Sequence, residues 1–130
     1  MGTVLLDTHA IHWWSAEPDR ISKRARVAIE GAEDLAVAAI SWYELSWLGH
    51  NGRIALSIPV RSWIQELSAH LRTIAISPAI AETAAALPHS FPGDPADRII
   101  YATAIETGLP LVTKDRALRR HPPPHDLVVW

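Results

Sequence analysis

The amino-acid sequence predicts an α/β fold in which helices cover both faces of a central parallel sheet. Short apolar runs that favour strands alternate along the chain with segments of helical pattern. Runs that are apolar at consecutive positions are typical of strands buried on both faces, as in parallel sheets. The length of 130 residues and the hydrophobic content of 48% fit one compact domain over residues 1–130.

The first strand is predicted at Thr3–Leu6, where the residues are apolar and favour strands, and Asp7 follows it directly. A short apolar helix is expected over residues 8–15. Ser22 then has the character of an N-cap, since a basic amphipathic segment follows it and ends near Gly31.

The second buried strand is predicted at residues 35–40. Ser41 and Glu44 have the spacing of a capping box, which indicates a helix that opens at Ser41 and stops around residues 49–52. A further helix is expected from about residue 59 to about residue 70.

The third strand is predicted at residues 72–76. Ser77 followed by Pro78 is the pattern of an N-cap with proline at the first helical position, so the alanine-rich stretch to Leu87 should be helical. Residues 88–93 form the loop that comes next.

Asp94 followed by Pro95 repeats the cap-and-proline pattern and opens a helix that closes at Gly108. The fourth strand is predicted at residues 109–113. A short basic helix follows it, and a last strand is expected at residues 127–130.

Four acidic residues are placed so that they can meet at one edge of this sheet. Asp7 follows the first strand, Glu44 lies on the helix after the second, Asp97 lies at the start of the helix before the fourth, and Asp115 follows the fourth. Parallel sheets of this kind place their chemistry beyond the carboxyl ends of the strands. The sequence therefore predicts a carboxylate cluster at that edge.

Carboxylates that converge without neutralising lysines repel one another unless a cation shares their charge. Ligand sets made only of oxygen favour Mg²⁺ or Mn²⁺, which keep some coordinated waters and bind substrate phosphates. Such an ion lowers the pKa of an attacking water and offsets charge on the phosphate, so the cluster indicates phosphodiester hydrolysis.

Each acid also has a purely structural interpretation. Asp7 could be only the N-cap of its helix, and Glu44 only the third residue of the capping box. Asp97 could complete the cap that Asp94 begins, and Asp115 could merely turn the chain. These alternatives stay open from the local sequence.

Four segments around these acids form a recognisable set. They are Leu-Leu-Asp-Thr-His-Ala at residues 5–10, Ser-Trp-Tyr-Glu at 41–44, Asp-Pro-Ala-Asp-Arg at 94–98 and Leu-Val-Thr-Lys-Asp at 111–115. Taken together, these motifs resemble those of the PIN-domain nucleases, and within them the VapC toxins of bacterial type II toxin-antitoxin pairs. The resemblance runs from Val4 to Asp115.

The resemblance implies a three-layer α/β/α domain with a central parallel sheet and an endoribonuclease that depends on Mg²⁺ or Mn²⁺. It further implies RNA as the substrate, with tRNA as one candidate, a small antitoxin encoded beside the toxin as inhibitor, and a homodimer or a higher complex with the antitoxin. One alternative within the family is a PIN-like module that binds proteins and has lost catalysis, which predicts missing acids.

The same resemblance assigns roles to individual residues. Asp7, Glu44 and Asp97 match the three core acids of the family, and Asp115 matches a more variable fourth. Thr113 matches a position that supports the site by hydrogen bonding. In the third motif, Asp94 and Arg98 are expected to cap the helix and to support the metal ligands from behind, and Ala96 replaces an aromatic residue often found there.

Basic and aromatic residues suggest binding surfaces. A run of four cations follows or overlaps the fourth motif and could hold the RNA backbone or be a solvated helix face: Lys114, Arg116, Arg119 and Arg120. A weaker second patch comprises Arg20, Lys23, Arg24 and Arg26. Four tryptophans gather on the helices nearest the predicted site and are either core or a protein-binding patch for a homodimer or the antitoxin: Trp13, Trp14, Trp42 and Trp47.

His9 and His12 could share a helix face, but no Glu lies between them in the manner of a zinc protease, so we expect His9 only to line the cleft. His9 also stands where a haloacid-dehalogenase phosphatase needs its second acid. Ser77 stands where a receiver domain needs its phosphoacceptor Asp. Both of these folds are therefore disfavoured.

Other global features restrict the possibilities less. The net charge of −2 gives no overall attraction to nucleic acid, so RNA contact requires a local basic patch or a bridging cation. The absence of cysteine excludes disulfides and thiolate zinc sites. Together with the lack of a signal peptide or an apolar run long enough for a membrane helix, this predicts a cytoplasmic protein.

Overall fold

The computed structural model describes residues 2–115, 118 and 128–130. In chain order the elements are β1 (Thr3–Leu6), α1 (Thr8–Ala16), the 3₁₀ helix η1 (Pro18–Arg20), α2 (Lys23–Glu30), β2 (Asp34–Ala38), α3 (Ala39–His50), α4 (Val60–Ser68), β3 (Arg72–Ile74), α5 (Pro78–Ala86), α6 (Pro95–Thr107), β4 (Leu111–Val112) and β5 (Val128–Val129).

The strands form one parallel sheet in the order β3-β2-β1-β4-β5. Leu6 pairs with Val37 of β2 on one side and with Val112 of β4 on the other, so β1 is the central strand and its end meets the ends of its two neighbours. The chain order reverses beside β1, and this is where a parallel sheet opens a crevice for chemistry. The predicted α/β fold with a parallel sheet is confirmed.

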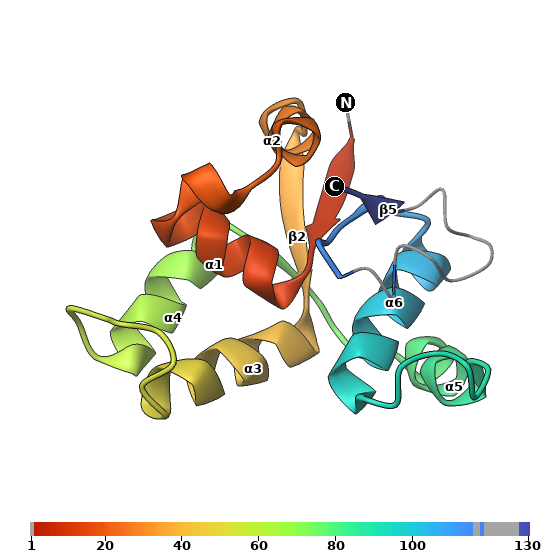
Figure 1. Cartoon of the computed structure of the whole chain (residues 1–130). Coiled ribbons are helices and arrows are strands. Elements are labelled where there is room, and N and C mark those ends of the chain that lie inside the picture. Colours follow the sequence, from red (N-terminus) through yellow and green to blue (C-terminus); the bar gives the residue numbers. More distant parts are fainter. Residues whose placement is uncertain (1, 116–117, 119–127) are drawn as a thin grey trace.

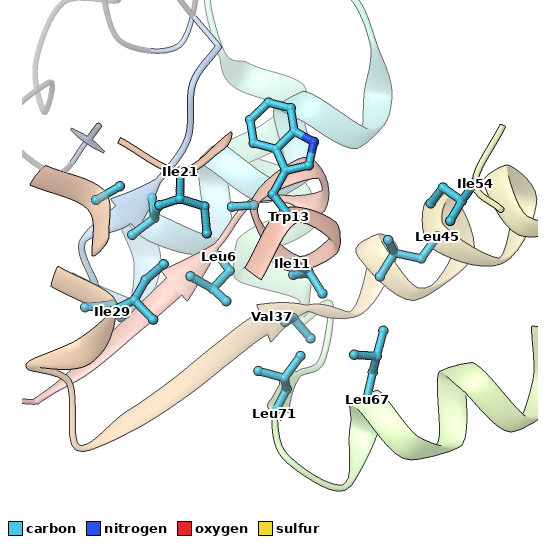
Figure 2. Close-up of a cluster of buried hydrophobic side chains, with 14 of the residues drawn as sticks. Leu6, Ile11, Trp13, Ile21, Ile29, Val37, Leu45, Ile54, Leu67 and Leu71 are labelled. Carbon is cyan, nitrogen blue, oxygen red and sulfur yellow. The ribbon is translucent and has the colours of Figure 1, made fainter. Parts of the chain in front are cut away.

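Helices cover the two faces of the sheet, with α1, α2 and α4 on one side and α5 and α6 on the other (Figure 1). The two sides bury different side chains of each strand. Leu6 and Val37 point to the side of α1, α2 and α4, where they join a large hydrophobic cluster with Ile11 and Leu67 (Figure 2). Leu5, one residue earlier, points to the opposite side and packs with residues of α6, on which α5 lies. The alternation along β1 produces the three layers.

Several predicted helix ends are confirmed because they depend on local chemistry. The hydroxyls of Ser22 and Ser77 accept from the backbone N–H three residues later at 3.1 Å, and the Asp94 carboxylate accepts from Ala96 N at 2.9 Å. Gly108 ends α6 with φ of 69°. This left-handed conformation is easiest for glycine, which has no Cβ.

The predicted capping box at Ser41 and Glu44 is wrong. Strand β2 ends at Ala38 and α3 begins at Ala39, so Ser41 and Glu44 both lie inside the helix, and the predicted strand end at residue 40 is helical. No side chain caps this helix start. Ser41 is fully buried and its hydroxyl faces Thr8 rather than the helix N-terminus.

Two further boundaries differ from the predictions. Strand β3 stops at Ile74 instead of residue 76, and β4 comprises only Leu111–Val112. The predicted basic helix after Asp115 and the start of the last strand at residue 127 fall largely outside the described residues. Among the helices that the structure describes, none is long and apolar enough to cross a membrane.

Candidate active site

Asp7 is held at the carboxyl end of β1 by Thr8, the first residue of α1, and by Thr113, which follows β4. Its Oδ1 accepts from the backbone N–H of Thr8 at 2.7 Å, and its Oδ2 accepts from the hydroxyl of Thr113 at 2.6 Å. The residue is only 4% exposed. Asp7 is therefore the N-cap of α1 and also a fixed carboxylate at the sheet edge, so the structural and functional interpretations are both compatible with its position.

Glu44 reaches the same edge from α3. The Thr8 hydroxyl, on α1, donates to Glu44 Oε1 at 2.5 Å and lies 3.0 Å from the hydroxyl of Ser41. One turn of α3 thus places Ser41 and Glu44 on the face that meets α1. Burial raises the pKa of Glu44, and the nearby charges of Asp7 and Asp94 raise it further.

Asp97 lies in the first turn of α6, and Asp94 caps the same helix. Burial raises the pKa of Asp97 to about 7, and the negative charges of Asp7, Asp94, Asp115 and Glu44 act in the same direction. The structure therefore brings Asp7, Glu44 and Asp115 within electrostatic range of Asp97. Asp94 is confirmed as the cap and adds a fifth negative charge.

Thr113 and Asp115 connect the end of β4 to this cluster. The Thr113 side chain is fully buried, accepts from the backbone N–H of Asp115 at 3.1 Å and donates to Asp7. The supporting hydrogen bond expected of Thr113 is thus present in the structure. Asp115 is partly exposed and its backbone is tied to the same hydroxyl that orients Asp7.

The donor chemistry of this cluster fits a divalent cation with water in its coordination sphere. Within the described part of the chain, no three Asp, Glu or His side chains converge closely enough to hold an ion by themselves. Mg²⁺ is commonly bound by only one or two carboxylates and retains several waters, so an open arrangement of this type suits it. In addition, no Lys or Arg of the described ranges forms an ion pair with Glu44 or Asp97, which leaves their charge to be shared by a cation.

Arg98 supports the site differently from the expectation that it backs the metal ligands. Its guanidinium donates to main-chain carbonyls of α5 and the following loop, at distances from 3.0 to 3.3 Å: Ala84, Leu87, Pro88, Phe91 and Pro92. It also lies over the Phe91 ring. Arg98 therefore clamps the loop that leads into Asp94 rather than orienting a carboxylate.

Of the four tryptophans predicted near the site, Trp47 is exposed and the other three are buried or partly buried. Trp13 is 8% exposed and belongs to the core, while Trp42 is partly buried and its indole N–H donates to Thr73 at 2.9 Å. Trp47 is 44% exposed, and Tyr43, four residues earlier on α3, is 66% exposed. With Glu44 and Leu48 these two aromatics line a pocket of about 330 Å³.

Of the predicted basic run, only Lys114 lies in the described residues, while Arg116, Arg119 and Arg120 lie outside them. The Lys114 ammonium is 5.4 Å from the centre of the Trp13 ring, beside the cluster. In the second patch, Arg20 stacks on Trp13 at 4.4 Å and Arg26 donates to the Pro18 carbonyl at 2.8 Å. These two arginines are thus engaged locally.

The sequence did not reveal the contributions of Thr8 and Ser41. Thr8 was assigned only to a helix start, and Ser41 was misread as a cap. The spacing of Ser41 and Glu44 does carry a usable signal, because residues three apart share a helix face. Their common partner, Thr8, can be identified only from the fold.

The raised pKa of Asp97 predicts how stability depends on pH without metal. Between its ordinary value of 3.8 and about 7, folded Asp97 keeps a proton that the unfolded chain has lost. The free energy of unfolding should therefore fall as the pH rises through this window. Thermal unfolding in EDTA from pH 4.5 to 8 measures it, and Asp97→Asn should flatten the slope. Equal slopes for the parent and the variant would contradict the assignment.

Comparison with known proteins gives consistent matches. The sequence profile of the PIN domain matches residues 4–122. The chain is 63% identical to Ribonuclease VapC22 of Mycobacterium tuberculosis (strain ATCC 25618 / H37Rv) over 130 residues, which is 100% of both chains. Its fold is similar to a toxin-antitoxin complex from Klebsiella pneumoniae (TM-score 0.71, 23% identity, 98% and 96% of the two chains). It is also similar to DNA-bound VapBC from Salmonella typhimurium (TM-score 0.68, 21% identity, 94% of each chain).

Proposed function

The chain belongs to the PIN-domain family, and from this premise we propose that it is a metal-dependent endoribonuclease of the VapC type, the toxin of a type II toxin-antitoxin pair. The observation that carries the proposal is the acidic environment of Asp97 near the carboxyl edge of the sheet, where burial and the negative charges of Asp7, Asp115 and Glu44 raise its pKa to about 7. The full-length similarity to a ribonuclease supports the choice of RNA as the substrate.

The carboxylates have distinct parts in the proposed mechanism. Asp7 and Asp97 would hold Mg²⁺, or Mn²⁺, with Glu44 and Asp115 completing the negative surface. When bound, the ion offsets charge on the scissile phosphate and lowers the pKa of the attacking water. The Thr113 hydroxyl and the Thr8 N–H fix both oxygens of Asp7. This geometry is set before the substrate arrives, so no binding energy is spent on ordering it.

Glu44 differs from Asp7 because only one of its oxygens is engaged by Thr8. Its Oε2 is thus available for a water or for a proton, and burial raises the pKa of Glu44 above that of an ordinary glutamate, which favours a proton on this carboxyl. Lys114, exposed beside the cluster, would contact the RNA backbone. Asp94 and Arg98 would act on the site indirectly. Asp94 caps the helix that carries Asp97, and Arg98 holds the loop before that helix.

The partner of this enzyme would be a small antitoxin that covers the site, and the protein would form a homodimer, or a higher complex with the antitoxin, in the cytoplasm. One of the structures of similar fold is, by its name, a toxin-antitoxin complex, and another is VapBC bound to DNA. Tyr43 and Trp47 offer exposed aromatic surface directly beside Glu44, and such surface is typical of protein interfaces. A short reading frame for a DNA-binding antitoxin beside the gene, whose product blocks cleavage, would support this pairing.

The proposed activity is tested with purified protein and total cellular RNA in Mg²⁺, in Mn²⁺ and in EDTA. Discrete RNA fragments are expected with either metal. EDTA should stop cleavage, and cleavage should return only when metal is added in excess over EDTA. tRNA and ribosomal RNA, supplied separately, identify the substrate. Cleavage that persists in EDTA would show that the carboxylates do not act through a metal.

A further inference from the structure

His9 lies between two parts of the candidate site that come from distant segments of the chain. It is the second residue of α1, and its Nδ1 is 3.6 Å from Asp7 Oδ2. Its Nε2 is 2.9 Å from the backbone N–H of Lys114, which follows β4. The imidazole thus bridges the end of β1 and the end of β4, where Asp115 also lies.

The contact with Lys114 determines where the imidazole proton must be. A backbone N–H can only donate, so His9 Nε2 must accept and cannot carry a proton. In the neutral ring the proton then sits on Nδ1, the nitrogen that faces Asp7. The 3.6 Å separation is longer than a hydrogen bond, so in this conformation the N–H dipole acts on the carboxylate electrostatically.

Aromatic neighbours keep this ring in place. The centre of the Trp13 ring is 4.9 Å from that of His9, and the Trp130 ring is 6.2 Å away in an edge-on arrangement. The ammonium of Lys114 lies over the same Trp13 ring, 5.4 Å from its centre. Lys114 is therefore held twice, by its backbone at His9 and by its side chain at Trp13.

We infer that His9 is a positioning residue that acts through Asp7 and through the backbone at Lys114. This inference rests on the proposed function. The Nδ1–H points toward the Asp7 Oδ2 that also accepts from Thr113 and so favours this orientation of the carboxylate, and the Nε2 acceptor holds the backbone between Thr113 and Asp115 in place. Groups that orient a metal-binding carboxylate in this way tune metal affinity without touching the metal.

Two near-isosteric variants separate the two contacts. In His9→Asn the amide nitrogen takes the place of Nδ1 and can still donate toward Asp7, but the side chain is too short to accept from Lys114. In His9→Gln the amide oxygen takes the place of Nε2 and can accept from Lys114, while nothing donates toward Asp7. His12→Gln is the matched control, because His12, three residues further along the same helix, faces Glu17 at 3.6 Å.

The first measurement is the tautomer of His9 in metal-free protein, from the ¹⁵N shifts of its ring nitrogens. A proton on Nδ1 supports the inference, and a proton on Nε2 overturns it. The second is Mg²⁺ binding by calorimetry: His9→Gln should weaken it about 10-fold, the loss typical of removing such an orienting group, and His9→Asn should weaken it less. His12→Gln should bind Mg²⁺ as the parent does.

The third measurement is hydrogen exchange at the Lys114 amide, where the two variants should rank in the opposite order to their effects on Mg²⁺ binding. His9→Asn should speed the exchange, and His9→Gln should leave it unchanged. A residue with a merely structural role would move both readouts together. Equal Mg²⁺ binding in the parent and both His9 variants overturns the inference. If the parent cleaves no RNA while the tautomer and binding results hold, the proposed function fails and the positioning role stands.

Discussion

Asp7→Asn is expected to lower RNA cleavage about a thousandfold or more, the scale seen when a member of a catalytic unit is removed. The asparagine oxygen can still accept from the Thr8 N–H, and its amide nitrogen would face Thr113, whose hydroxyl can reorient. The fold should therefore persist while the negative charge that holds the cation is lost. Initial rates of RNA cleavage at saturating Mg²⁺, with a thermal melt of each sample, measure both effects.

Asp34→Asn is the matched control for this charge removal. Asp34 lies at the opposite end of β2 from the site and pairs on the surface with Arg72 at 3.5 Å. Such an exposed pair contributes little, so this variant should cleave RNA like the parent. A folded Asp7→Asn protein with parental activity would show that the carboxylate mechanism is wrong.

The parts of the fold that could be predicted from sequence are those set by neighbouring residues. Ser77 and Asp94 cap their helices because their short side chains reach a backbone N–H two or three residues later. Gly108 ends α6 because few other residues tolerate its backbone angle. The buried strand β1 could be recognised because both of its faces are covered, which leaves a continuous apolar run.

The environment of Glu44 could not be predicted in the same way. Ser41 and Glu44 have the spacing of a capping box. In the structure, however, the Ser41 hydroxyl contacts the hydroxyl of Thr8, which lies 33 residues before it in the sequence, and caps no helix. A tertiary hydrogen bond thus overrides a local pattern. The resemblance to a family predicts Glu44 as a site residue, whereas Thr8, the residue that donates a hydrogen bond to it, can be identified only from the fold.

The role of Arg98 is a second example. The motif that contains Asp94 and Arg98 correctly indicated a helix start, and the resemblance added that Arg98 supports the site. Which atoms it binds depends on how residues 88–92 fold back over α6, and the sequence of that loop carries no period or cap from which this could be read. The loop carbonyls are satisfied by a side chain from the following helix.

Arg98→Ala is expected to lower the free energy of unfolding by about 2–4 kcal/mol, because a half-buried guanidinium is lost and the carbonyls it binds are left to compete for water. Five carbonyls accept from this one side chain: those of Ala84, Leu87, Pro88, Phe91 and Pro92. The planar fork of donors is what reaches them all. Urea unfolding followed by circular dichroism measures the loss.

Arg98→Lys tests whether the fork or the charge matters, because an ammonium has the same charge but cannot span several carbonyls. It should recover less than half of the lost stability, and Arg24→Ala, at an exposed position of α2, should cost almost nothing. Full recovery by lysine would contradict the clamp. Since the clamped loop leads into Asp94 and Asp97, the variants should also lose RNA cleavage at temperatures where the chain as a whole is still folded.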